Sequence, residues 1–137
     1  MVSGWVPYGP RGFTRPILKL LAGKLERRGG GVYTGVLASG ELLRAAELLP
    51  PANLEDRQNF APRLRDFLRV ARAEPRALFE VYVVPEERED ERLAVEGAYV
   101  PSDRPDLIGY LYKRGAQPDR EEVVVVGGTV YHHMWWD

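Results

Sequence analysis

The fold is decided by the stretch ALFEVYVVPEEREDERLAVEGAYV, which covers residues 77–100. Aromatic and β-branched residues dominate its two ends, residues 77–84 and 92–100, and alternate there as in half-buried strands. The charged segment 85–91 lies between them and is short enough to join antiparallel neighbours. The stretch therefore predicts a β-hairpin with one buried face. The side chains predicted on that face are Phe79, Val81, Val83, Leu93, Val95 and Tyr99.

A second hairpin is predicted near the C-terminal end. Residues 123–126 and 129–136 are rich in β-branched and aromatic residues, and Gly127-Gly128 lies between them. A two-residue Gly-Gly turn is typical of tightly connected antiparallel strands. A further strand is predicted at residues 32–38, ahead of both hairpins.

Four helices complete the expected elements. Apolar residues recur at helical spacing in residues 15–28, 41–49 and 60–73. Residues 103–114 begin and end with residues typical of helix termini, although their apolar residues also alternate as in a strand. We predict a helix for this segment.

These segments give the order α-β-α-α-β-β-α-β-β. Because hairpins join the later strands, a fully parallel sheet is excluded and an α+β fold is predicted. We expect an antiparallel or mixed sheet of about five strands, with the helices packed on one face. We also expect a single domain over residues 1–137, with an extended Gly/Pro-rich arm at residues 1–13.

The composition is that of an ordinary globular protein. Of the 137 residues, 45% are hydrophobic and 28% are charged, and the net charge is -1. The chain has no cysteine, which excludes disulfides, thiolate metal centres and thiol catalysis. No apolar run reaches the roughly 18–20 residues that span a bilayer, and no signal peptide is evident, so we expect a cytoplasmic protein. Scarce amide residues and 11 prolines suit a heat-adapted protein. Nearly all basic residues are arginine rather than lysine, and this preference can equally reflect genome composition.

The charges are divided unevenly along the chain. Residues 1–80 carry 13 basic and 8 acidic side chains, whereas residues 81–137 carry 6 basic and 12 acidic ones. Opposite charges that meet across the folded surface would explain this division. An anion-binding basic face, or association between opposite faces of two molecules, would explain it as well.

The central hairpin brings two glutamates together. If Val83 pairs with Leu93, Glu80 is expected directly opposite Glu96, with Tyr82 beside them. Like charges in these positions need an arginine, a shared proton or a divalent cation between them. The pair is therefore a candidate catalytic site, although a solvated face is the simpler interpretation.

Two histidines lie on the last predicted strand. His132 and His133 are adjacent, so they point to opposite faces and should not bind one metal ion together. The Gly-Gly turn places Glu122 opposite His133 and makes Glu121 a diagonal neighbour of His132. Such pairs can support acid–base chemistry, but a structural Glu–His pair is the preferred interpretation.

An arginine column is predicted on the helix at residues 60–73. Arg65, Arg69 and Arg72 recur at positions i, i+4 and i+7, away from the apolar stripe. Guanidinium groups suit bidentate contacts with phosphate, so this column is a candidate ligand-binding surface. A solvated polar helix face would give the same pattern.

Three tryptophans are candidate interface residues: Trp5, Trp135 and Trp136. Consecutive residues of a strand face opposite sides, so one of Trp135 and Trp136 can lie in the core and the other needs cover elsewhere. We favour a homodimer contact over a base-stacking platform, because no arginine or lysine follows Arg120.

Two functions remain open. The preferred hypothesis is a non-catalytic, dimeric protein that binds an anionic ligand, such as nucleic acid or a nucleotide, through its basic N-terminal half. The alternative is a small hydrolase that uses a divalent cation at Glu80 and Glu96. No motif indicates a cofactor, and none is predicted.

Overall fold

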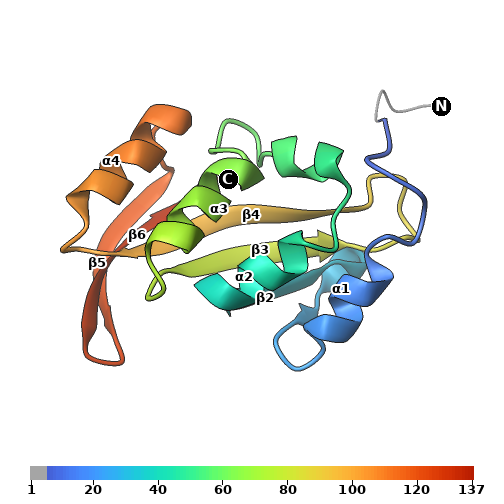
Figure 1. Ribbon diagram of the computed structural model, residues 1–137, viewed down its shortest axis with the longest axis horizontal. Helices are drawn as coiled ribbons and strands as arrows, with labels where there is room; N and C mark the ends of the chain where they lie inside the picture. The colour runs from blue at the N-terminus through green and yellow to red at the C-terminus, as the bar shows by residue number, and fades with distance from the viewer. Residues whose placement is uncertain (1–5) are drawn as a thin grey trace.

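The computed structural model describes residues 6–137, so the expected interface residue Trp5 lies outside the described residues. Figure 1 shows the arrangement of the elements along the chain. In chain order they are α1 (Arg15–Leu20), β1 (Glu26–Arg27), a 3-10 turn (Gly29–Gly31), β2 (Tyr33–Ala38), α2 (Ser39–Ala46), a second 3-10 turn (Pro51–Glu55), α3 (Leu64–Ala73), β3 (Leu78–Val84), β4 (Arg92–Pro101), α4 (Pro105–Arg114), β5 (Arg120–Val126) and β6 (Thr129–Trp135).

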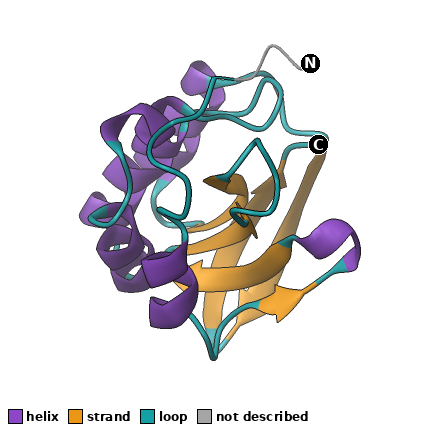
Figure 2. Cartoon of the chain, turned by 90° about the vertical axis from the view of Figure 1, so that its right-hand side faces the viewer, coloured by secondary structure: helices purple, strands orange, loops and turns teal. Residues whose placement is uncertain are grey.

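The predicted α+β fold is confirmed. Six strands form one sheet in the order β1-β2-β3-β4-β6-β5, and every neighbouring pair is antiparallel. The four α-helices lie on one face of this sheet, which leaves the other face open (Figure 2). We refer below to the helix side and the open side of the sheet.

The sixth strand arises where a longer helix was expected. Helix α1 ends at Leu20, and residues 26–27 instead turn back and pair with β2. Gly35 on β2 permits this path, because a Cβ atom there would lie 2.3 Å from the carbonyl oxygen of Lys24. The apolar spacing alone did not reveal this close approach of two backbones.

The core lies between the helices and the sheet. Phe67 of α3 makes edge-to-face contacts with Phe79 of β3, at a centroid distance of 6.2 Å, and with Trp136, at 5.8 Å. Such contacts combine burial with favourable ring electrostatics. They fix α3 over the centre of the sheet, and the polar face of α3 consequently points away from it.

Helix α3 begins later than predicted. The amide of Arg63 donates a hydrogen bond to the carboxylate of Asp66, which caps the helix before Leu64. Asn59 adopts a left-handed conformation with φ of 46°, so the chain turns there. Phe60, the first residue of the predicted helix, therefore lies outside it and is 72% exposed.

A β-bulge changes the predicted register of the central hairpin. Val83 pairs with Leu93 as expected, but Glu80 pairs with Gly97 instead of Glu96. The register shifts between Glu80 and Val81, so β4 has one extra residue there. Side chains beyond the bulge consequently change faces, and Tyr99, predicted on the buried face, stacks on the open side.

The later elements agree with the sequence. Residues 105–114 form helix α4, and Val126 pairs with Thr129 across the Gly127-Gly128 turn. Both turn glycines have positive φ values, which glycine adopts without strain. No helix within residues 6–137 has the length and apolar character needed to cross a membrane.

Candidate functional site

Helices α3 and α4 form the sides of a basic hollow. They contact each other above the sheet (Figure 1), and a surface cavity of about 250 Å³ opens between them. The apolar stripe of α3 faces the core, so its polar face carries the predicted arginine column into this hollow. The lining residues are Arg65, Asp66, Arg69, Arg72, Tyr110 and Arg114.

Tyr110 organises the two sides of the hollow. The guanidinium carbon of Arg69 lies 5.1 Å from the centre of its ring, and that of Arg114 lies 4.9 Å away. Both distances are typical of cation–π contacts. The Tyr110 hydroxyl donates a hydrogen bond of 3.2 Å to the buried carboxylate of Asp66. The ring therefore holds one arginine from each helix at the edge of the same cavity.

The positive charge of the hollow is largely unneutralised. Arg65 forms an ion pair of 3.3 Å with Glu55. Within residues 6–137, no carboxylate forms an ion pair with Arg69, Arg72 or Arg114. Among the described residues that line the hollow, Asp66 is the one carboxylate beside the four arginines. Guanidinium groups in such excess favour the binding of an anion, particularly one whose oxygen atoms can accept two hydrogen bonds from the same guanidinium, such as phosphate or carboxylate.

The sequence identified only half of this hollow. Arg65, Arg69 and Arg72 share one helix, so their spacing placed them on one face. Tyr110 and Arg114 belong to α4, and only the packing of α4 beside α3 brings them to the column. No sequence signal marks that juxtaposition.

A second cluster lies on the open side of the sheet, around His133. Its Nε2 atom lies 2.5 Å from Oε1 of Glu80, and its Nδ1 atom lies 3.3 Å from Oε2 of Glu122. The imidazole stacks on the ring of Tyr99, with centroids 4.0 Å apart and planes 2° from parallel. The predicted neighbour Glu122 is confirmed opposite His133, whereas the Glu80 contact depends on the bulge and was not foreseen.

The other histidine faces the helix side. The Nε2 atom of His132 lies 3.2 Å from Glu121 and 3.0 Å from the hydroxyl of Tyr112 on α4. The predicted proximity of Glu121 is therefore confirmed. Because the two histidines point to opposite faces, they act separately, as the strand periodicity indicated.

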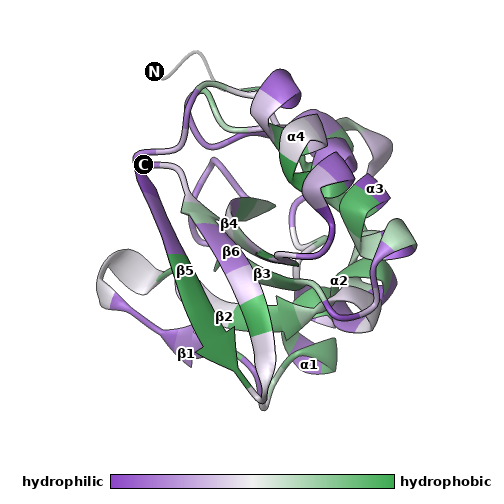
Figure 3. Ribbon diagram, turned by 90° about the vertical axis from the view of Figure 1, so that its left-hand side faces the viewer, coloured by the Kyte–Doolittle hydropathy of each residue, from purple (hydrophilic) through white to green (hydrophobic). Residues whose placement is uncertain are grey.

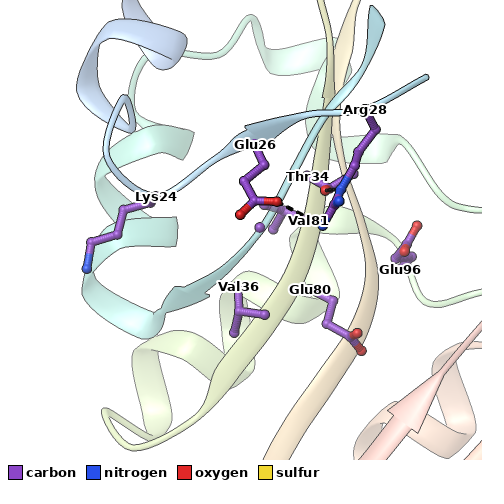
Figure 4. A pocket seen from close by; sticks show the side chains of 9 residues that line it. Lys24, Glu26, Arg28, Thr34, Val36, Glu80, Val81 and Glu96 are labelled. Atoms are coloured by element: carbon purple, nitrogen blue, oxygen red, sulfur yellow. Dashed lines mark hydrogen bonds and ion pairs between the residues drawn. The ribbon is translucent and has the colours of Figure 1, made fainter. Parts of the chain in front are cut away.

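Glu80 and Glu96 share the open side but differ in their partners. They line a cavity of about 400 Å³, shown in Figure 4, together with Lys24, Glu26 and Arg28. Burial raises the pKa of Glu96; the indole N–H of Trp135 opposes that rise, and the Glu80 carboxylate adds to it. The cavity contains both signs of charge, so it has no single electrostatic preference.

The open side offers little support for a metal centre. Among residues 6–137, no group of three or more His, Asp or Glu side chains is placed to hold a metal ion. The carboxylate of Glu80 already contacts His133. The hydroxyl of Tyr82 is hydrogen-bonded to Gln58 and accepts a bond of 3.1 Å from Arg92, and burial raises its pKa.

The two C-terminal tryptophans lie in different environments. Trp136 is 2% exposed, and its indole N–H donates to the carbonyl of Ala116 at 2.8 Å. Its assignment to an interface is therefore wrong, because the core already covers it. Trp135 lies on the open side, where its N–H donates to Glu96 at 3.3 Å and Arg120 lies 5.4 Å from its ring.

The α3–α4 hollow is thus the site with the clearest chemical preference. Its guanidinium groups come from two helices and converge on one cavity, whereas the acidic and basic groups of the open side largely neutralise one another. Comparison of the chain with models of protein families, with curated proteins and with solved structures finds no match.

Proposed function

We propose that this protein binds a phosphate-bearing anion, such as a nucleotide or a nucleic-acid backbone, in the hollow between α3 and α4. The observation that carries this proposal is the convergence of four arginines on one cavity of about 250 Å³. Their mutual repulsion is unfavourable in the free protein and is relieved when an anion lies among them. The proposed role is one of binding, since Asp66 and Tyr110, the two lining residues other than the arginines, are hydrogen-bonded to each other.

The geometry supports phosphate over a single small halide or carboxylate. Arg69 and Arg114 come from facing helices and contact the same tyrosine ring, so an anion between the helices can meet donors from two sides. A phosphate group has several oxygens to accept such bonds, and guanidinium groups bind two of them at once. Binding dominated by such contacts should weaken as salt concentration rises.

The decisive experiment is a calorimetric titration at low salt with pyrophosphate and, separately, with a short single-stranded oligonucleotide. The variant Arg69→Ala/Arg72→Ala should lose at least about tenfold in affinity, which corresponds to about 1.4 kcal/mol. The matched control is Lys19→Ala/Arg44→Ala, which removes the same charge from exposed positions on α1 and α2.

The control variant should bind within about twofold of the original chain, since it leaves the hollow intact. Both variants should unfold within about 0.5 kcal/mol of it, because all four positions are exposed. Equal affinity of the three proteins, or an equal loss in both variants, would show that the hollow is not the binding site.

Self-association and a cytoplasmic location belong to the same proposal. Exposed valines at the end of the β5–β6 hairpin support self-association, because exposed apolar patches favour association. The absence of cysteine is consistent with a reducing compartment. The alternative of a metal-assisted hydrolase has less support, since Glu80 is paired with His133 and no ligand trio surrounds it.

A further inference from the structure

Strand β5 is a long edge of the sheet. It pairs with β6 on one side, and in residues 6–137 no strand pairs with its other side. In an antiparallel strand, the backbone groups of every second residue point to the outer edge. Seven residues, Arg120–Val126, thus carry a row of backbone donors and acceptors along this edge.

The side chains of this edge are unusually apolar for an exposed strand. Val123 and Val125 are 66% and 67% exposed, and Val126 is nearly half exposed, as is Val130 on the neighbouring strand β6. Figure 3 shows the hydrophobic colour of β5 toward the hairpin turn. Val123 shares the helix side with His132, which contacts α4, and Val125 follows the same alternation. The valines therefore extend past the region that the helices cover.

Protective features common to edge strands are confined to the first three residues of β5, Arg120, Glu121 and Glu122, which are charged. Soluble proteins shield exposed edges with charged side chains, above all lysine, and with proline, bulges or very short strands. Residues 120–126 contain neither lysine nor proline, and β5 pairs with β6 without a register shift. The opposite edge of the sheet, β1, is only two residues long. One edge is thus protected by its shortness and the other is open.

We infer that β5 pairs antiparallel with β5 of a second copy of this chain. Pairing β5 with the two-residue β1 of another copy would leave most of β5 without a partner. Pairing β5 with β5 of the second copy gives hydrogen-bond partners to the outer backbone groups of both strands. The two copies then contribute the same surface around a twofold axis, as isologous dimers require. The inference rests on the self-association proposed above and names the surface that carries it.

Side-chain periodicity and charge restrict the register of this pairing. In two paired antiparallel strands, directly opposite residues face the same side of the sheet. The twofold axis must therefore pass between one residue and its own copy, and the pairing is said to be centred on that residue. Centring on Glu121 or Glu122 would oppose a glutamate to its own copy, which is unfavourable. Centring on Val123 would oppose both glutamates to valines. Centring on Val124 opposes Val123 to Val125, and centring on Val125 opposes Val124 to Val126, so these two registers pack valines against valines. The apolar part of the strand therefore becomes the middle of the interface.

This geometry has a consequence for the basic hollow. A twofold axis perpendicular to the sheet keeps the helices of both copies on the same side of one continuous sheet. Both α3–α4 hollows then lie on the same side of that sheet, so a ligand long enough to span them would contact two of them. Such bivalent contact raises apparent affinity without any new kind of contact.

Sedimentation velocity at about 100 μM protein tests the inference. The original chain should sediment as a dimer, and Val125→Lys should sediment as a monomer with an unchanged circular dichroism spectrum. The matched control is Val36→Lys, which introduces the same charge at a valine of β2 that is 48% exposed and distant from β5. The control should remain dimeric.

Single-cysteine variants test the register, since the chain has no cysteine of its own. Residues that oppose their own copy lie within the distance at which a disulfide forms. One of Val123→Cys, Val124→Cys and Val125→Cys should therefore cross-link at least about tenfold faster under mild oxidation than Val36→Cys.

The outcomes separate the two proposals. A monomeric original chain would overturn both the edge pairing and self-association. A dimer that persists in Val125→Lys and gives no faster cross-linking at positions 123–125 would overturn the edge pairing alone. Phosphate binding is measured separately, so its loss leaves this inference unaffected.

Discussion

On the open side of the sheet, a single glycine determines where the Glu80 carboxylate can lie. Gly97 lies in the bulge opposite Glu80, and a Cβ atom at this position would lie 2.2 Å from the Glu80 carboxylate. The missing side chain leaves the space in which that carboxylate meets His133. Glycine is therefore needed at position 97 because the Glu80 carboxylate lies so close to it. Its φ value is not positive, so the backbone conformation alone does not require glycine.

Replacing Gly97 by alanine should displace the Glu80 carboxylate and weaken its contact with His133. We expect a loss of about 1–2 kcal/mol in the free energy of unfolding, measured by urea denaturation. Gly40→Ala is the control, because nothing lies within 4 Å of a Cβ there and alanine favours the helix. It should be neutral or stabilising. A Gly97→Ala protein as stable as Gly40→Ala would contradict this account.

Glu74 provides a pH-dependent stabilisation. It is buried at the end of α3, and hydrogen bonds from Arg76, reinforced by Arg104, lower its pKa to about 2. A depressed carboxylate pKa stabilises the folded state above the normal value near 4.5 and ceases to do so as pH falls toward 2.

The variant Glu74→Gln should accordingly lose about 1–2 kcal/mol of stability at pH 7. The difference from the original chain should shrink as pH falls from about 4.5 toward 2. Urea denaturation across this pH range measures it, with exposed Glu47→Gln as the control. A difference that is constant with pH would show that the ion pairs of Glu74 do not stabilise the fold.

At the scale of elements, one buried glutamate joins the N-terminal segment to the loop between β3 and β4. The carboxylate of Glu91 accepts hydrogen bonds from the amides of Gly12 and Thr14 and, at 2.6 Å, from the Thr14 hydroxyl. These donors precede α1, so Glu91 fixes where that helix starts. The Tyr8 hydroxyl adds a bond of 2.6 Å to Asp56.

Removing this connection should free the N-terminal segment. Glu91→Ala leaves the buried amides and hydroxyl of residues 12–14 without an acceptor, and we expect it to cost about 2–3 kcal/mol. Hydrogen exchange should rise first in residues 12–20. Exposed Glu87→Ala, in the same loop, is the control and should change neither quantity. Unchanged exchange in Glu91→Ala would contradict this role.

At the scale of the molecule, the uneven charge of the sequence is partly used for folding. Arg76 pairs with Asp103 at 2.8 Å, and Arg15 pairs with Glu86, so the basic half meets the acidic half across the surface. In the α3–α4 hollow, by contrast, Arg69, Arg72 and Arg114 form no ion pair with the carboxylates of the described residues. Folding therefore separates arginines with a structural ion pair from those of the proposed binding site.

The two sides of the sheet also divide the proposed roles. The helix side carries the basic hollow, the open side carries the His133 cluster, and the exposed edge lies at β5. Because the edge is distant from α1 and β1, pairing there leaves the N-terminal segment uncovered. Binding and association can thus be altered by separate substitutions.

Sequence alone determined the elements that depend on neighbouring residues. The hydrophobic alternation in residues 77–84, the Gly127-Gly128 turn and the periodicity of α3 are local patterns, and each predicted its element, although α3 begins at Leu64 and not at Phe60. The same locality explains why Arg65, Arg69 and Arg72 could be placed on one face. It also explains why Glu121 and Glu122 were assigned to their histidines, since a two-residue turn fixes the register.

Tertiary structure alone decided what depends on distant backbones meeting. The bulge at Gly97 moved Tyr99 to the open side, and Gly35 permits the close approach of the backbone at Lys24, where a longer helix was predicted. The packing of α4 beside α3 added Tyr110 and Arg114 to the hollow. One extra residue in a strand reverses the side chains that follow, and helix–helix packing depends on the whole core. No local pattern in the sequence indicates the extra strand residue or the packing of the two helices.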